Sequence, residues 1–290
     1  MARVFTPGEV YGGLVPTPGD VLATKHLLSR YLERLVIGSQ IYGARFFGST
    51  AFGTPTSRSD IDVYIQTTDH SCDDFVRAIV QGLEISTRVP IENGLIVAQQ
   101  HARCGWHSLD RGLYQHISRA PKAGNIIGED PLSSTLLVDD KNDHDFMAYV
   151  SHKRKNLNDS GRPKELRLQR ALEAPVNVGR RLVEHLIRVG GLSPGIILND
   201  RKQTVLRCLQ DSGILPRNSL ESFNILLELD ILYDETLRRA LRGGCVDYAQ
   251  VFYELCDEAP SLAVEFVNGI AQGFCENIEG RVWSLPQTKR

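Results

Sequence analysis

The chain of 290 residues is 42% hydrophobic and 23% charged, and its formal net charge at pH 7 is −2. This length allows two domains that each bury a core, and the balanced charge excludes the strongly basic character that would indicate nucleic acid as the main partner. The first residues lack the apolar core of a signal peptide, and no apolar run approaches the length of a membrane span. We therefore expect a cytoplasmic protein, with no membrane partner, that acts on a small molecule or a protein in preference to a long nucleic acid.

Hydrophobic periodicity predicts a small sheet with helices on one side in the first half of the chain. The helix that starts at residue 71 has a capping-box pattern and an apolar face that includes Phe75 and Leu83. The expected order is a helix starting at residue 20, strands over 42–47 and 60–66, a helix starting at residue 71, and strand-like runs over 88–98 and 125–131.

The cysteines and histidines of this half do not form a recognisable metal-binding pattern. The chain has six cysteines and no Cys-x-x-Cys pair, which favours buried, reduced thiols over a zinc site or a disulfide scaffold. His101 and His107 flank Cys104 and Trp106, but their spacing matches no common set of ligands. We interpret these four residues as part of a loop or a pocket lining, with a metal cluster as the alternative.

The stretch from Gly48 to Asp62 is the most informative part of the sequence. Gly48 lets the backbone approach a phosphate closely, and Ser49 adds a hydroxyl and an N–H at the start of a short helix. Asp60 and Asp62 then share one face of a strand, where two converging carboxylates suit Mg²⁺ completed by substrate phosphates and water. Each half of the pattern alone is common in ordinary turns and strand ends. Together, the two halves predict metal-assisted nucleotidyl transfer.

In its spacing Gly48-Ser49-x10-Asp60-x-Asp62, this stretch resembles the signature of the DNA polymerase beta-like nucleotidyltransferase superfamily. The compact form of minimal nucleotidyltransferases and aminoglycoside adenylyltransferases is the most similar. The resemblance implies that Gly48 and Ser49 bind a nucleoside triphosphate, and that Asp60 and Asp62 are catalytic residues and ligands of Mg²⁺. It also implies ATP as the donor nucleotide.

The family has a third carboxylate on a following strand, which holds a metal ion or takes the proton from the attacking hydroxyl. Glu92 is the only acid in the run 88–98 and is the candidate for both roles, with an ordinary exposed Glu as the alternative. Pro90 and Gly94 blur the register of this strand. The catalytic and metal-binding set expected from the resemblance is therefore Asp60, Asp62 and Glu92.

Further contacts to the nucleotide phosphates are expected from residues inside the motif, namely Arg45, Arg58 and Ser59. The second half of the chain supplies other cations, which either form a solvated helix face or hold the triphosphate or an acidic substrate. These cations are Lys153, Arg154, Lys155, Arg162, Lys164, Arg167, Arg170, Arg180 and Arg181, preceded by His152.

A polar run over 138–145 predicts a linker between a nucleotidyltransferase domain at 1–140 and a helical bundle domain at 145–280. The expected fold class is therefore α+β (mixed α/β), a small nucleotidyltransferase sheet with flanking helices followed by an all-helical bundle. The helices of the second half are predicted over 146–157, 166–189, 200–212, 219–241, 248–256 and 259–276.

The helical half resembles, over residues 165–240, the HEPN domains that accompany minimal nucleotidyltransferases. Active members cut RNA with an Arg-x4-6-His motif on a later helix, but the segment 222–235 has neither residue. Arg180 and His185 match this motif on an earlier helix, where such a pair is usually two neighbours on one face. The resemblance leaves RNA open as a partner and allows a homodimer through the helical domain.

We expect a substrate hydroxyl to attack the α-phosphate of the bound nucleotide, with pyrophosphate as the leaving group. Asp60 and Asp62 bridge the metal ions in this mechanism, and Glu92 assists as ligand or base. A small molecule, a protein hydroxyl and an RNA end are all acceptors that fit the donor site. Two alternatives stay open: a nucleotide-binding interaction protein of the toxin–antitoxin type with little turnover, and a ribonuclease that needs Arg180 and His185 exposed together.

Overall fold

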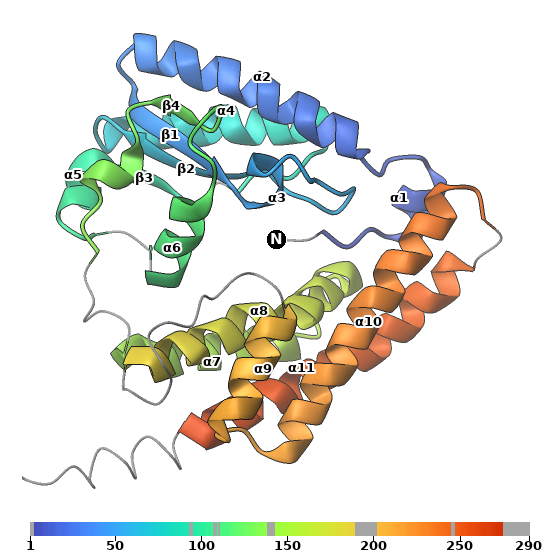
Figure 1. Cartoon of the computed structure of the whole chain (residues 1–290). Helices are drawn as coiled ribbons and strands as arrows, with labels where there is room; N and C mark the ends of the chain where they lie inside the picture. Colours follow the sequence, from blue (N-terminus) through green and yellow to red (C-terminus); the bar gives the residue numbers. More distant parts are fainter. Residues whose placement is uncertain are drawn as a thin grey trace, which may run out of the picture. The chain divides into compact units, whose positions relative to one another are not determined.

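The computed structural model describes residues 3–92, 95–106, 109, 111–137, 143–188, 202–244 and 247–274. The chain divides into two compact units, which Figure 1 shows in the colours of the sequence. Unit 1 consists of Met1–Arg3 and Tyr11–Asp140, and unit 2 consists of Val4–Val10 and Lys141–Arg290.

Unit 1 is built on a four-stranded open sheet in the order β3-β2-β1-β4. Strand β1 pairs antiparallel with β2 on one side and with β4 on the other, whereas β2 and β3 are parallel, so the sheet is mixed. The strands are β1 (Ile41–Phe47), β2 (Asp62–Thr67), β3 (Ile96–Ala98) and β4 (Ile126–Gly128).

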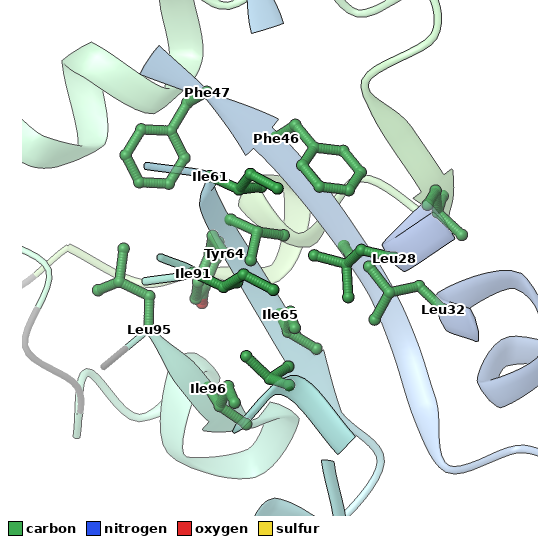
Figure 2. Close-up of a cluster of buried hydrophobic side chains, with 14 of the residues drawn as sticks. Leu28, Leu32, Phe46, Phe47, Ile61, Tyr64, Ile65, Ile91, Leu95 and Ile96 are labelled. Carbon is green, nitrogen blue, oxygen red and sulfur yellow. The ribbon is translucent and has the colours of Figure 1, made fainter. Parts of the chain in front are cut away.

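Six helical segments in the described part of unit 1 connect or cover these strands. Leu28 and Leu32 of α2 pack with Phe46 of β1 and with Ile61 and Ile65 in one apolar core (Figure 2). The segments are α2 (Pro18–Ile37), α3 (Gly48–Ala51), α4 (Ser71–Thr87), α5 (Gln99–Arg103), α6 (Arg111–Arg119) and the 3-10 helix η1 (Pro131–Ser134).

Three details of unit 1 differ from the expectations drawn from the sequence. The capping box expected for the helix that starts at residue 71 does not form, because the N-cap residue of α4 is His70 and its side chain makes no capping hydrogen bond. Phe75 is 51% exposed, because the buried stripe of α4 runs through Val76, Val80 and Leu83, and Phe75 lies beside it. The strand-like run 88–98 is also not one strand: among its described residues, only an isolated bridge at Ile91 and the short β3 are paired with the sheet.

Every secondary-structure element among the described residues of unit 2 is a helix, and none of the described helices in the chain is both long and apolar enough to cross a bilayer. The predicted break before Pro260 is wrong, because α11 continues through this proline. Pro260 itself is buried in the helical core, where packing offsets the lost N–H. The helices are α7 (Asp143–Asn158), α8 (Lys164–Arg188), α9 (Lys202–Ser212), α10 (Arg217–Leu241) and α11 (Tyr248–Phe274).

Residues 4–10 belong to unit 2, although they precede the whole of the sheet in the sequence. Helix α1 (Pro7–Tyr11) begins in this segment, and Phe5 is fully buried. The chain therefore combines a small mixed sheet and its helices with a separate group of helices, as expected for the α+β class.

Candidate functional site

The candidate site begins where β1 ends and α3 starts. Gly48 follows the last strand residue directly and has a left-handed backbone with φ of +66°. Antiparallel pairing sets Phe47 opposite Asp62, which brings the Asp62 carboxylate against the α-carbon of Gly48. A Cβ at position 48 would lie 2.0 Å from Asp62 Oδ2. Both the backbone conformation and this close approach require glycine.

Hydrogen bonds between the two ends of the motif close the loop after α3. Ser49 Oγ donates to Ser59 Oγ at 2.9 Å, and Ser59 Oγ also accepts from the main-chain N–H of Thr56 at 2.8 Å. The N–H of Thr54 donates to the carbonyl of Ser49 at 3.0 Å. These contacts hold the Gly48-Ser49 turn beside the residues that lead into β2.

Asp60 and Asp62 lie on one face of the chain as it enters β2, and Ile61, which is fully buried, faces the other way. Asp60 is 9% exposed and Asp62 is half-buried. The structure thus brings Gly48 and Asp62 together, and Asp60 lies two residues before Asp62 in the chain. Two carboxylates are a donor set that Mg²⁺ accepts, because this ion commonly takes one or two carboxylates and completes its shell with phosphate and water oxygens.

Glu92 lies next to this pair in the sheet. Ile61 forms a parallel bridge with Ile91, and the N–H of Glu92 donates to the carbonyl of Ile61 at 3.0 Å. Alternation therefore puts Glu92 on the same face as Asp62. Within the part of the chain that the structure describes, however, no group of three or more His, Cys, Asp or Glu side chains is arranged to hold a metal ion.

Arg45 is buried, and its guanidinium is held by contacts within unit 1. Its side chain is 2% exposed, and Nη1 donates to Asp130 Oδ2 at 2.7 Å in an ion pair. Nη2 donates to the carbonyls of Ser118 and Ala120 at 2.9 and 3.1 Å. The guanidinium thus ties β1 to the C-terminal end of α6 and to the residue before η1, and these contacts replace the expected role of Arg45 as a phosphate ligand.

Arg58 and Ser59 are also engaged within unit 1. Arg58 is 6% exposed; its Nε donates to the carbonyl of Arg3 at 3.1 Å, and its own carbonyl accepts from the N–H of Arg3. Arg58 therefore fixes the main chain around Arg3. Ser59 is 9% exposed and closes the motif loop through its hydroxyl.

Lys25 and Asn125 hold the main chain of α3 in place, and neither was among the residues predicted for the site. Lys25 Nζ donates to Asn125 Oδ1 at 2.6 Å and to the carbonyl of Thr50 at 3.2 Å, while Asn125 Nδ2 donates to the carbonyl of Ala51 at 3.2 Å. Burial lowers the pKa of Lys25. The one sign of this role in the sequence was that Lys25 lies between the apolar positions of the helix predicted to start at residue 20, which is α2.

The polar face of β2 continues into a buried network that orients the strand. Gln66 is fully buried, and its Nε2 donates to the carbonyl of Pro131 at 2.7 Å and to Thr135 Oγ1 at 2.9 Å. Tyr64 shares this network through its hydroxyl, 2.9 Å from Thr135 Oγ1, and burial raises the pKa of Tyr64. The strand that carries Asp62 is therefore anchored to η1 and the residue that follows it.

In unit 2, Arg180 and His185 are not exposed together. His185 is 3% exposed, and its ring packs against Phe146 and Phe274 with centroids 5.9 and 4.9 Å apart. Arg180 lies 3.6 Å from Glu184 in an ion pair within α8. This environment gives His185 a packing role in the helical core.

The segment with His107 lies partly outside the described residues. His101 contacts Trp106 and His70 through their rings, at 5.8 and 5.4 Å, and Cys104 is exposed.

Comparisons with protein-family models and with curated proteins find no match for this chain.

Proposed function

We propose that unit 1 is a magnesium-dependent nucleotidyltransferase that moves a nucleoside monophosphate, AMP from ATP, to a hydroxyl group and releases pyrophosphate. One observation carries the proposal. The Asp62 carboxylate meets the α-carbon of Gly48 so closely that a Cβ would lie 2.0 Å from Oδ2. A carboxylate held against a left-handed glycine turn is expected where a metal ion joins phosphate oxygens to the protein.

The roles of the residues follow from their positions. The turn at Gly48 and Ser49 presents main-chain N–H groups and a hydroxyl, which bind phosphate oxygens. Asp60 and Asp62 hold Mg²⁺, which when bound neutralises the triphosphate and stabilises the charge that develops on the leaving pyrophosphate. Glu92, on the same face of the sheet as Asp62, is the candidate to accept the proton of the attacking hydroxyl.

The proposal is tested by incubating the full chain with Mg²⁺ and α-labelled ATP, GTP, CTP or UTP. The acceptors are an aminoglycoside, the protein itself and total RNA. We expect label transfer from ATP, and loss of transfer in Asp60→Ala/Asp62→Ala. Asp74→Ala is the matched control, because Asp74 is an exposed carboxylate on α4. Transfer that survives the double substitution contradicts the assignment.

A second candidate function is nucleotide binding with little turnover, in an interaction protein of the toxin–antitoxin type. The observation that favours it is that Asp60 and Asp62 are not joined by a third ligand into a metal-binding group among the described residues. Magnesium-dependent ATP binding that requires both aspartates, without transfer to any acceptor, would support this function over the enzyme. A ribonuclease would need Arg180 and His185 exposed together, and the buried ring of His185 does not support that function.

A further inference from the structure

Helix α10 of unit 2 carries exposed apolar side chains outside the stripe that it buries. The buried stripe includes Phe223, whose ring meets that of Phe266 on α11 edge to face, with centroids 5.1 Å apart. Outside this stripe, three large aliphatic side chains within about two turns of the helix are between 36% and 50% exposed, namely Ile225, Ile231 and Leu232. Single exposed apolar residues are common, whereas a group of them beside polar residues marks an interaction surface.

A row of glutamates runs along the same side of α10. Glu221, Glu228 and Glu235 are exposed and follow one another at intervals of seven residues. Because seven residues are close to two helical turns, the three side chains form a line along the helix. Glu221 is paired with Arg217 at 3.1 Å. Glu228 and Glu235 make no hydrogen bond or ion pair within the part of the chain that the structure describes, so their charges are available to a partner.

The glutamates and the apolar side chains form one continuous surface. Helical spacing puts Ile225 and Leu232 on one side of the glutamate row and Ile231 on the other. The first and last glutamates are about 21 Å apart along the helix axis, which is long enough to contact several turns of another helix. We call the following residues the α10 surface: Glu221, Ile225, Glu228, Ile231, Leu232 and Glu235.

We propose that the α10 surface docks a basic amphipathic helix of a partner protein. Lysine or arginine side chains at intervals of seven residues lie about 10 Å apart on such a helix, and this spacing matches the glutamate row. Apolar residues beside these cations cover the exposed aliphatic side chains of α10. The surface lies within unit 2, so the proposal does not depend on nucleotidyl transfer by unit 1.

The charge of the glutamate row disfavours other occupants. Three carboxylates repel the phosphates of a nucleic acid and the headgroups of anionic lipids. An antiparallel second copy of the chain that aligns its Leu232 with Ile231 sets Glu228 opposite Glu235, and a parallel copy sets identical glutamates side by side. Like charges that face each other across an interface weaken binding. A positively charged partner is the occupant that neutralises the row.

The test measures binding of a labelled helical peptide to the full chain by fluorescence anisotropy. The peptide of about 20 residues has lysine at intervals of seven residues with leucine beside each lysine, and a second peptide has glutamate in place of lysine. We expect Glu228→Gln/Glu235→Gln to weaken binding of the lysine peptide about tenfold, because two ion pairs are lost. The matched control is Glu254→Gln/Glu258→Gln, which changes two exposed carboxylates on α11 and should bind as before.

The apolar part of the surface has its own variant. Ile225→Ser/Leu232→Ser should also weaken binding about tenfold, because two partly exposed aliphatic side chains no longer become buried. This loss should persist at high salt, whereas the loss in Glu228→Gln/Glu235→Gln should shrink as salt screens the charges.

Three results of the peptide titrations overturn the proposal: no binding of the lysine peptide, equal binding of both peptides, and an equal loss in the α11 control. Sedimentation velocity of the chain alone tests the second copy as the occupant. A monomer agrees with the proposal, because the glutamate row then prevents self-association. A dimer that Glu228→Gln/Glu235→Gln makes tighter assigns the surface to a second copy and overturns the proposal.

Discussion

Gly48 is the residue at which one added methyl group should affect the candidate site most. Alanine at this position must adopt a φ near +66°, which costs about 1 to 2 kcal/mol, and its Cβ must displace Asp62 Oδ2 from 2.0 Å away. We expect Gly48→Ala to lower the free energy of urea unfolding by about that amount, and to reduce label transfer roughly a hundredfold because Asp62, the proposed metal ligand, moves.

Gly53 provides a control that separates the effect of backbone strain from the effect of displacing Asp62. It has a φ of +72°, but a Cβ there would meet no heavy atom within 4 Å. Gly53→Ala should therefore show the same loss of unfolding free energy with near-normal transfer. If both variants lose transfer equally, backbone strain is responsible and the contact with Asp62 is not.

Lys25 links the stability of the turn to pH. Lys25→Met removes the donor from Thr50 and from the buried Asn125, and should cost about 1 to 3 kcal/mol in unfolding free energy. Burial lowers the pKa of Lys25 in the folded protein below the usual 10.5, which the unfolded chain keeps. At pH values between the lowered pKa and 10.5, the unfolded chain therefore binds more protons than the folded one. The stability due to Lys25 must then rise with pH through this window and level off above 10.5.

Urea unfolding of the wild type and Lys25→Met over a series of alkaline pH values measures this effect as a difference. Subtraction removes the titration of all groups that the two proteins share. The expected difference grows as the pH approaches 10.5 from below. A difference that shrinks over the same range contradicts the assignment of the lowered pKa to Lys25.

Among the elements, α2 carries Lys25 and the core residues Leu28 and Leu32, and its start is fixed by a capping box. The Thr17 hydroxyl accepts from the N–H of Asp20 at 3.2 Å, and Asp20 Oδ2 accepts from the N–H of Thr17 at 2.8 Å. Thr17→Ala should lower the unfolding free energy by about 1 kcal/mol. Thr17→Ser keeps the hydroxyl and should unfold like the wild type; an equal loss in both variants would show that the methyl group matters instead.

The helical and strand segments were largely predictable from local periodicity, whereas the contacts between them were not. Alternation of apolar residues indicated that Asp60 and Asp62 share a face, because this depends only on neighbours in the sequence. That Asp62 lies against Gly48 depends on the antiparallel register, and the ion pair of Arg45 with Asp130 joins residues 85 positions apart. No periodic signal encodes such pairings, so Arg45 was expected at the phosphate.

On the scale of the whole molecule, the placement of residues 4–10 in unit 2 was equally inaccessible to sequence patterns. Phe5 is fully buried, its N–H donates to the Tyr233 hydroxyl at 2.7 Å, and its carbonyl accepts from the Tyr248 hydroxyl at 2.7 Å. The two hydroxyls lie 2.9 Å apart. Two tyrosines from α10 and α11 therefore satisfy both main-chain groups of a residue more than 200 positions away.

Tyr248→Phe tests whether this network holds residues 4–10 in unit 2. The substitution keeps the buried ring but removes the donor to the carbonyl of Phe5, which should cost about 1 to 3 kcal/mol because that carbonyl stays buried. Urea unfolding followed by circular dichroism measures the loss, and hydrogen exchange should become faster in residues 4–10. Tyr253→Phe is the matched control, since Tyr253 is 49% exposed on the same helix. If exchange in residues 4–10 stays as slow in Tyr248→Phe as in this control, the hydroxyl network does not hold the segment, and burial of the Phe5 side chain must do so.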